Sequence, residues 1–265
     1  MPGSVAFDTV GTGILKPRQR QTRILDVVAR DGEATVEALS AVFDVSAETI
    51  RRDLAALAET GQLQKVHGGA RRLRLHAEGS FQERMAENAA AKTVIAGKLA
   101  GIVEPGDTLF VDTGTTTLIA AEALARIPRL TVITNSLRVA QLIGRADAGS
   151  RVFLLGGLFA ADNAETLGQM ALQQVARFQA DHALIGPAAV DAAVGVMNAD
   201  FDEAQIARAM CDHARNTIVL AHGAKLGRKA AFHVCRLDEI DVLVCDERPS
   251  DAFAAALEAA RVDLR

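Results

Sequence analysis

Residues 46–54, Ser-Ala-Glu-Thr-Ile-Arg-Arg-Asp-Leu, constrain the fold of this chain more than any other stretch, because they carry the signals of one short helix. Ser46 is a preferred N-cap residue, and Glu48 places a negative charge in the first turn, where the helix dipole favours it. Gly61 follows the last apolar residue of the pattern and marks a helix end. We therefore predict a helix near residues 47–59.

The apolar residues of this helix recur on one face. Ile50, Leu54 and Leu57 have the spacing of a single buried stripe, which turns the polar residues near the N-terminal end toward another face. In helix-turn-helix proteins that end of the recognition helix enters the major groove of DNA. The candidate DNA contacts on the helix are Ser46, Thr49, Arg51 and Arg52.

The flanking sequence completes a small domain over residues 18–75. An amphipathic helix around residues 24–28 precedes a second helix that Thr35 can cap, and Asp44 begins the turn before the recognition helix. Downstream, two short strand patterns flank Gly68 and Gly69, which can adopt the positive φ angles of a tight hairpin turn. The prediction is a winged helix-turn-helix, with Lys65 and His67 as further candidate DNA contacts on the wing.

Charge distribution favours this interpretation over the alternative that Arg51 and Arg52 are ordinary solvated arginines of a helical bundle. Residues 16–76 contain 11 Lys and Arg against 8 Asp and Glu, whereas residues 77–265 contain 18 against 24. A basic segment joined to an acidic body is typical of a nucleic-acid-binding domain that carries a second domain. Trp and Tyr are absent, which disfavours a base-stacking surface for single strands and favours duplex DNA.

Composition limits the remaining classes of protein. With 265 residues and 49% hydrophobic content, the chain can form a small domain and a larger one with its own core. We expect a flexible tail over residues 1–17 and, because no apolar run spans a bilayer and no leader pattern is evident, no membrane partner and a cytoplasmic location. Three widely spaced cysteines indicate neither a disulfide framework nor a metal site.

Residues 76–91 are predicted to connect the two domains, with the boundary near residue 78. This segment is polar, and Phe81 and Met85 supply short apolar contacts that can dock it onto the second domain. The second domain then occupies residues 92–265.

Strand and helix patterns alternate through the second domain. This alternation predicts an α/β domain with a mainly parallel sheet, whose ligands gather beyond the carboxyl ends of the strands. The predicted strands are residues 108–111, 130–134, 151–155, 183–185, 217–221 and 242–245, and the predicted helices are residues 92–103, 117–125, 137–143, 166–178 and 202–214.

Polar turns follow several of these strands and suit a phosphate group. The turn after the first strand opens a helix, so its backbone amides and hydroxyls can converge on an anion. Lys225 follows a later strand and can add a cation. The candidate effector-binding residues in these turns are Asp112, Gly114, Thr115, Thr116, Thr117, Thr134, Asn135, Ser136, Gly156, Gly157 and Lys225.

Each turn alone has a purely structural interpretation, as a helix N-cap, a turn former or a loop. Taken together the turns are better explained by one small phosphorylated ligand that uses all of them. The spacing is neither a Walker A loop nor a Gly-x-Gly-x-x-Gly fingerprint, so nucleotide hydrolysis and a dinucleotide cofactor have no support. We predict no cofactor.

Residues 46–54 with His67 to Ala70 resemble the signature of the DeoR family of bacterial transcriptional regulators, and the polar turns, Glu203 and Lys225 to Arg228 resemble that family's effector domain. The resemblance spans residues 18–250 and is greatest to glycerol-3-phosphate regulon repressors. It implies a repressor whose C-terminal domain is similar in fold to sugar-phosphate isomerases and binds a phosphorylated sugar or derivative, with Glu203 as a further effector contact. Relatives tend to have an acid and a hydroxyl where this chain has His222 and Ala224.

The predicted function is a DNA-binding repressor of a sugar or polyol metabolism operon, which a phosphorylated effector releases. Its expected partners are double-stranded operator DNA, the effector and further copies of the chain, as a dimer or tetramer. One alternative is an isomerase-like enzyme fused to a DNA-binding domain, for which Asp112, Glu203 and His222 are the available general bases. Another is an activator or architectural DNA binder, which would show no ligand-dependent release. We predict a regulator without catalytic residues.

Overall fold

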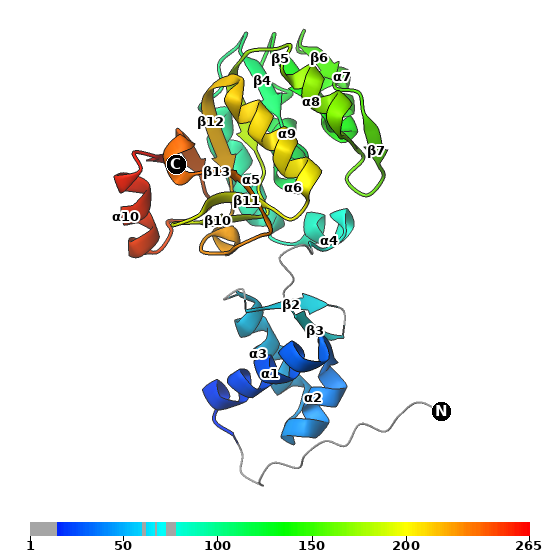
Figure 1. Ribbon diagram of the computed structural model, residues 1–265, viewed down its shortest axis with the longest axis vertical. Coiled ribbons are helices and arrows are strands. Elements are labelled where there is room, and N and C mark those ends of the chain that lie inside the picture. Colours follow the sequence, from blue (N-terminus) through cyan, green and yellow to red (C-terminus); the bar gives the residue numbers. More distant parts are fainter. Residues whose placement is uncertain (1–14, 60–61, 67, 73–77) are drawn as a thin grey trace. The chain divides into compact units, whose positions relative to one another are not determined.

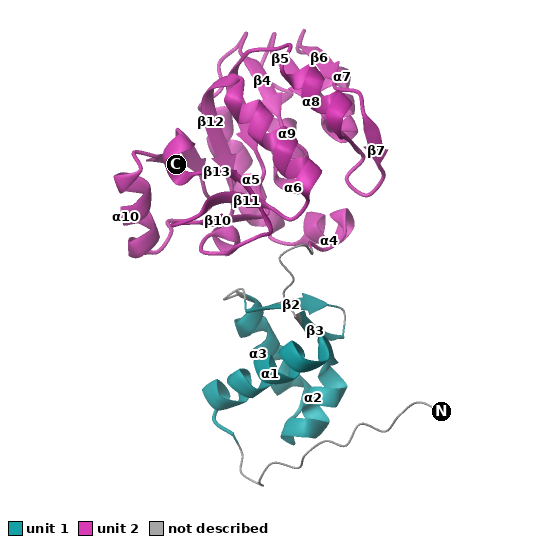
Figure 2. Ribbon diagram, viewed as in Figure 1, with its two compact units in different colours: residues 1–74 teal, residues 75–265 magenta. Residues whose placement is uncertain are grey.

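The computed structural model describes residues 15–59, 62–66, 68–72 and 78–265. The chain divides into two compact units, residues 1–74 and 75–265, shown in separate colours in Figure 2. No helix within the described ranges is both long and apolar enough to cross a membrane.

The N-terminal unit is a winged helix-turn-helix, as predicted. Three helices, α1 (Pro17–Asp31), α2 (Val36–Phe43) and α3 (Ala47–Glu59), pack beside a three-stranded antiparallel sheet. The strands are β1 (Glu33–Thr35), β2 (Leu63–Val66) and β3 (Gly69–Arg72), in the order β1-β3-β2. The core of this unit contains Ile24, Val28, Val36, Leu39, Ile50, Leu54, Leu57, Leu63 and Ala70.

The wing differs from the prediction in one strand and one glycine. Strand β1 was not predicted, and it pairs with β3 on the side away from β2. Gly68 has the expected positive φ of 76°. Gly69 does not, and a Cβ atom there would lie 2.4 Å from the carbonyl oxygen of Ala34. Gly69 is therefore needed for the close approach of β1 to β3.

The C-terminal unit is built on a seven-stranded parallel sheet (Figure 1). From β4 the chain adds β5 and β6 on one side, and then continues on the other side with β9, β12, β14 and β15. The strand order reverses between β4 and β9, which is the point where ligands bind in open α/β sheets. The strands are β4 (Thr108–Val111), β5 (Thr131–Thr134), β6 (Arg151–Leu154), β9 (Ala180–Ile185), β12 (Ala214–Leu220), β14 (Val242–Val244) and β15 (Asp263–Leu264).

Helices cover both faces of this sheet because successive strand residues point to opposite sides. Leu109 and Val111 of β4 join one core with α5 (Ala89–Ala100), α6 (Thr115–Leu124) and α7 (Leu137–Arg145). Phe110 joins a second core with α8 (Gln169–Val175), α9 (Phe201–Asp212) and α10 (Asp251–Ala259). The α/β fold predicted from the alternating pattern is confirmed.

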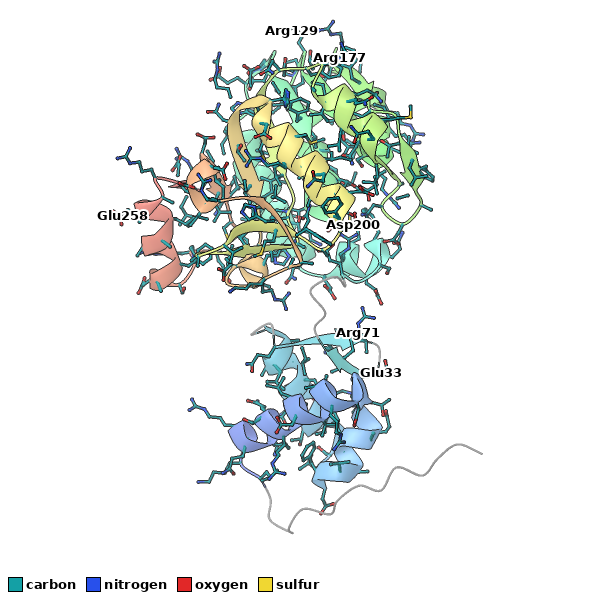
Figure 3. The ribbon with its side chains drawn as sticks, in the orientation of Figure 1. Glu33, Arg71, Arg129, Arg177, Asp200 and Glu258 are labelled. Atoms are coloured by element: carbon teal, nitrogen blue, oxygen red, sulfur yellow. The ribbon has the colours of Figure 1, made fainter. Side chains whose placement is uncertain are left out.

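Smaller elements gather at the carboxyl edge of the sheet (Figure 1). In Figure 3, Asp200 lies toward this edge, while Arg129 and Arg177 lie at the opposite one. The smaller elements at this edge are the hairpin β7 (Leu158–Ala160) and β8 (Glu165–Leu167), the strands β10 (Ala189–Asp191), β11 (Gly195–Asn198) and β13 (Phe232–Cys235), helix α4 (Phe81–Ala86), and the 3-10 helix Gly223–Lys225. A second 3-10 helix, Leu237–Glu239, precedes β14.

Two regions differ from the sequence-based boundaries. Residues 166–178 were predicted as one helix, but residues 166 and 167 belong to β8, which pairs with β7, and α8 begins at Gln169. The predicted linker, residues 76–91, contains α4, whose Phe81 side chain is buried. Residues 1–14 of the expected flexible tail lie outside the described residues.

Candidate functional site

Helix α3 begins as the sequence predicts. The Ser46 hydroxyl accepts a hydrogen bond from the Thr49 amide at 3.2 Å, which satisfies one of the free donors of the first turn. Thr49 Oγ1 lies 2.9 Å from the same hydroxyl. Ile50, Leu54 and Leu57 are buried, which confirms the predicted apolar stripe. The cap and the stripe together fix which residues α3 presents to solvent.

The two arginines of α3 are exposed. The side chain of Arg51 is 55% exposed and that of Arg52 is 80% exposed, and each lies within 3.7 Å of the Glu48 carboxylate. Exposed ion pairs of this kind are weak, so both guanidinium groups remain available to a stronger anion such as a DNA phosphate. Lys65 is exposed on β2. His67 lies outside the described residues.

A buried ion pair holds α3 against α1 and was not predicted. The Arg20 guanidinium donates to the Asp53 carboxylate, and both side chains are less than 10% exposed. Gln21 Nε2 donates to the other Asp53 oxygen at 3.2 Å. Because Asp53 follows Arg52 directly, this contact helps to set the rotation of the helix that carries both arginines.

Replacing Asp53 with alanine is expected to lower the free energy of unfolding of the N-terminal unit by about 3 kcal/mol, because the Arg20 charge stays buried without its partner. Native-state hydrogen exchange of the α1 and α3 amides in the full chain measures this loss. Asp26→Ala, an exposed change on α1, serves as the control. Equal protection in both variants would contradict the prediction.

In the C-terminal unit, the predicted turn after β4 opens helix α6. Gly114 is the N-cap residue of α6, with a φ of 131° that L side chains rarely adopt, and no side chain caps the helix there. The first-turn amides of a helix have no acceptor within the helix. Thr115, Thr116 and Thr117 are all buried on this turn, and Thr117 Oγ1 donates to the Gly114 carbonyl at 3.0 Å. The turn therefore presents amide donors to an anion.

The side chain of Asp112 links the ends of β4 and β9, the two strands between which the strand order reverses. Its carboxyl oxygens accept from the amide of Thr113 at 2.8 Å and from the amide of Gly186, the residue after β9, at 3.3 Å. Burial and the nearby Glu165 raise the pKa of Asp112 to about 8. Asp112 is therefore protonated near neutral pH in the free protein.

A buried network of amides and carboxyls lies beside this turn. Asn163 Nδ2 donates to Glu165 at 2.9 Å and to Glu203 at 2.7 Å, so the two carboxyl groups share one donor. Asn135 Nδ2 also approaches Glu165, at 3.4 Å. Burial raises the pKa of both Glu165 and Glu203, and the negative charge of Glu165 raises the pKa of Glu203 further. Glu203 was a predicted contact, whereas Glu165 and Asn163 were not.

Lys225 is partly buried and lies within electrostatic range of these acids. Its ammonium group donates to the carbonyl of Pro187. Burial lowers the pKa of Lys225, while Asp112 and Glu203 act in the opposite direction. Burial and the positive charge of Lys225 lower the pKa of His222 to about 3, so this imidazole is neutral. The site therefore places the Lys225 cation among several carboxyl groups.

Other predicted contacts are used within the protein. The Gly156 amide donates to Gln174 Oε1 at 3.0 Å, and a Cβ atom on Gly157 would lie 2.5 Å from the Leu167 carbonyl oxygen. Thr134 Oγ1 accepts from the Ser136 amide, and Ser136 Oγ caps α7 by accepting from Val139. These glycines and hydroxyls shape the two loops through internal contacts.

Several buried polar atoms at the carboxyl edge have no hydrogen-bond partner within the described part of the chain. They include Thr116 Oγ1, Asn135 Oδ1 and His222 Nδ1. Leaving such a group unpaired costs about 1–3 kcal/mol. Unpaired buried atoms at the end of a parallel sheet indicate a place where a polar ligand completes the hydrogen bonding.

Raising the pH is expected to destabilise the C-terminal unit in the absence of ligand. The Asp112 pKa rises from 3.8 to about 8, so between these values the folded protein holds a proton that the unfolded chain has released. Stability is therefore greatest at the acidic end of the window, and it falls by about 1.4 kcal/mol per pH unit for a fully buried group. Urea unfolding at pH 5.5 and 7.5 measures the slope.

Asp112→Asn should make this pH dependence shallower, because position 112 then has no proton to lose, while Glu165 and Glu203 keep their contribution. Asp147→Asn, an exposed change, should leave the slope unaltered. An unaltered slope in Asp112→Asn would assign the effect to other groups and contradict the prediction.

A winged helix-turn-helix unit followed by an α/β unit with a buried polar site is the architecture of a ligand-responsive transcriptional regulator. Residues 20–74 match the DeoR-like helix-turn-helix domain, and residues 87–247 match the DeoR C terminal sensor domain. The chain belongs to the DeoR family of transcriptional regulators.

Its relatives are repressors of similar length. The HTH-type transcriptional repressor CsqR of Escherichia coli K12 is 31% identical over 245 residues, which cover 92% of this chain and 94% of that protein. The glycerol-3-phosphate regulon repressor of the same organism is 30% identical over 235 residues, covering 89% and 93%. GlcR, an HTH-type transcriptional repressor of Bacillus subtilis, is 29% identical over 247 residues, covering 93% and 95%. The protein is a regulator rather than an enzyme.

Solved structures show likeness of fold. The tetrameric eIF2B-beta2-delta2 complex from C. thermophilum contains a chain with a TM-score of 0.50 and 14% identity, covering 92% of this chain and 88% of that one. Ribose 5-phosphate isomerase A from Methanocaldococcus jannaschii has a TM-score of 0.40 and 17% identity, covering 53% and 55%.

Proposed function

We propose that the protein is a cytoplasmic repressor of a sugar or polyol metabolism operon, and that a phosphorylated sugar or polyol releases it from its operator. One observation carries the proposal. The uncapped first turn of α6 and the partly buried cation Lys225 lie with Asp112 and Glu203 at the point where the strand order reverses.

The two kinds of group in the site suit the two ends of such a ligand. Amides at a helix N-terminus and a lysine ammonium bind phosphate. The amide oxygen of Asn135 and the carboxyl groups of Glu165 and Glu203 accept hydrogen bonds from hydroxyl groups. Of the predicted contacts, Asp112, Gly114–Thr117, Asn135, Glu203 and Lys225 retain this proposed role.

In the N-terminal unit, the proposed DNA contacts are Ser46, Thr49, Arg51, Arg52 and Lys65. The arginines have the exposure that base and phosphate recognition requires, and Ser46 and Thr49 lie at the N-terminal end of α3. His67 keeps its sequence-based assignment as a DNA contact.

We further propose that the working form contains at least two copies of the chain, because a dimer presents two recognition helices to two half-sites. Exposed apolar side chains near the β6 edge of the sheet offer a self-complementary surface for the second copy. These side chains are Phe153, Leu154, Leu158, Phe159 and Met170. Light scattering that gives the molar mass of a single chain would overturn this part of the proposal.

A thermal-shift screen of phosphorylated sugars and polyols, each beside its unphosphorylated parent, tests the effector class. The proposal expects a rise in the unfolding temperature for a phosphorylated compound and none for its parent. The compound found should then reduce binding to a duplex that the protein has selected from a random library. A ligand that stabilises the protein without affecting DNA binding would contradict release.

A further inference from the structure

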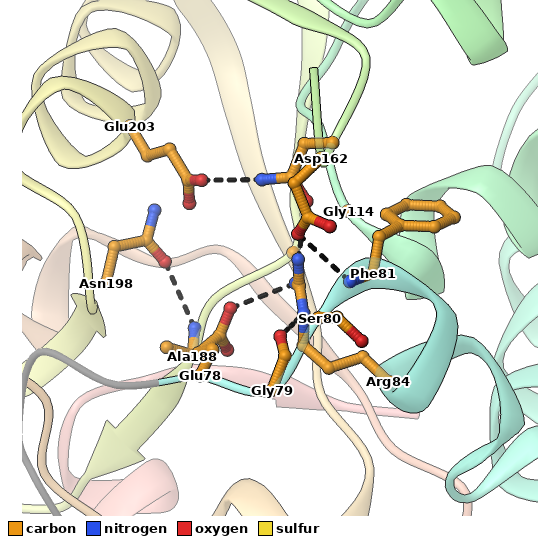
Figure 4. A network of polar contacts seen from close by, with 12 residues as sticks. Glu78, Gly79, Ser80, Phe81, Arg84, Gly114, Asp162, Ala188, Asn198 and Glu203 are labelled. Atoms are coloured by element: carbon orange, nitrogen blue, oxygen red, sulfur yellow. Dashed lines mark hydrogen bonds and ion pairs between the residues drawn. The ribbon is translucent and has the colours of Figure 1, made fainter. Parts of the chain in front are cut away.

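Residues 78–88 lie against the site at the carboxyl edge of the sheet. In the sequence, they follow the DNA-binding unit and the short segment after it. Helix α4 begins with a capping box, in which Ser80 and Glu83 each bond the other's backbone amide. Its Phe81 amide donates to the Asp162 carboxylate at 3.0 Å, and the Arg138 guanidinium stacks 3.9 Å from the Phe81 ring centroid. Figure 4 shows the hydrogen bond between the Phe81 amide at the start of α4 and Asp162.

Arg84 is the central contact of this segment. Its guanidinium forms an ion pair with Glu78 at 2.9 Å, donates to the Gly79 carbonyl at 3.0 Å and donates to Asn163 Oδ1 (Figure 4). The side chain of Arg84 is 17% exposed and that of Glu78 is 26% exposed. The pair is therefore half-buried, and water reaches both partners.

The amide of Asn163 connects Arg84 to the acidic part of the site. Its oxygen accepts from Arg84, while its nitrogen donates to Glu165 and Glu203. A ligand that hydrogen-bonds to Glu165 or Glu203 therefore competes for the side-chain amide of Asn163, which also binds Arg84.

Glu78 and Arg84 also interact electrostatically with Lys225. Among the groups that change the pKa of Lys225, Glu78 raises it and Arg84 lowers it, so both lie within electrostatic range of the ammonium group. Lys92 ties the far end of the segment down, because its ammonium group donates to the carbonyls of Arg84 and Glu87. Lys92, Lys225 and Arg84 are thus three cations close to Glu78, which supplies part of the negative charge that balances them.

We propose that Arg84 is an effector-binding residue that exchanges Glu78 for the anionic group of the ligand, and that this exchange releases residues 78–80 from the site. The inference rests on the proposed function, in which the ligand is phosphorylated. Phosphate oxygens match the guanidinium fork in a bidentate manner and carry more charge than one carboxylate, so they displace a partly solvated Glu78. The released residues lie at the end of the segment nearer in sequence to the DNA-binding unit.

The exchange makes Glu78 a competitor of the ligand, which a single substitution can test. Calorimetric titrations with glycerol 3-phosphate, glucose 6-phosphate and inorganic phosphate are compared for the wild-type chain and E78Q. We expect E78Q to bind the anions about 5- to 10-fold more tightly, because the competing charge is gone. E87Q removes the same charge from an exposed position on the same segment and should bind as the wild type does.

Two Arg84 variants separate binding from folding. Arg84→Gln should bind the anions at least 10-fold more weakly, and Arg84→Lys should recover part of the loss, since it restores the charge without the planar fork. Unfolding temperatures without ligand show whether both variants remain folded. Equal loss in both variants, despite intact folding, would make Arg84 a structural residue and overturn the proposal.

Hydrogen exchange of the full-length protein reports the release itself. Anion binding should speed exchange of the residue 79–81 amides in the wild type, and slower exchange there would show that the ligand tightens the segment, contrary to the proposal. If the anions bind the wild type and E78Q equally, the exchange with Glu78 is wrong while the proposed function stands. If neither these anions nor any phosphorylated compound of the thermal-shift screen binds the wild type, the proposed function fails and this inference fails with it.

Discussion

Replacing Arg51 and Arg52 together with alanine is expected to abolish specific DNA binding and to leave the protein folded. Each arginine that contacts a base edge or phosphate is worth about 1–3 kcal/mol, so the double variant should bind its operator at least about 30-fold more weakly. The dependence of affinity on salt should also become shallower, because fewer phosphate charges are neutralised. Fluorescence anisotropy with a labelled operator duplex at several salt concentrations measures both effects.

The fold should survive this change because neither arginine takes part in the core. Their nearest acidic partner, Glu48, is itself exposed, and the residues that hold α3 in place are Ile50, Asp53 and Leu54. Arg126→Ala with Arg177→Ala removes the same charge from exposed positions of the C-terminal unit. If the variant with Arg51 and Arg52 replaced has the same operator affinity and salt dependence as this control, α3 is not the recognition helix.

Replacing Lys225 with alanine is expected to uncouple the protein from its effector while DNA affinity is retained. A charge-assisted hydrogen bond contributes about 1.5–3 kcal/mol, so effector affinity should fall about 10- to 100-fold. The loss should be greater for the phosphorylated compound than for any unphosphorylated analogue, because the ammonium group is the proposed phosphate contact. Titrating effector into the complex of protein and operator gives the concentration needed for release.

Two further variants make the Lys225 result specific. Lys225→Met keeps most of the side-chain volume without the charge, and it should lose effector affinity as the alanine variant does. Lys229→Ala removes a nearby charge outside the proposed contacts and should respond normally. Release of DNA by Lys225→Ala at the wild-type effector concentration would show that the role assigned to Lys225 is wrong.

Local patterns were sufficient to predict the recognition helix and the parallel sheet. Helix α3 follows from a cap and an apolar stripe that lie within a few residues of each other, and its bounds agree with the prediction. The inner parallel strands are short apolar runs with little exposure on either face, and β4 was predicted to the residue. Such signals do not depend on distant parts of the chain.

Elements that depend on distant partners escaped prediction. Strand β1 is three residues long and exists because β3 pairs with it, and β8 carries a helix-like sequence but pairs with β7. Chain folding brings these partners together, and a window of sequence cannot show them.

The same limit applies to the site. The turns after β4 and β5 were predicted because polar residues at strand ends are visible in the sequence. Asn163, Glu165 and Arg84 were missed because their roles come from long-range contacts, such as the bond between Arg84 and Asn163.

The central claim is that effector and operator bind the same protein and weaken each other. Operator affinity measured without effector and at saturating effector gives one coupling factor, and effector affinity measured without and with saturating operator gives another. Linkage requires the two factors to be equal, and we expect each to be about 5- to 150-fold. Operator affinity that does not change at saturating effector would contradict the account.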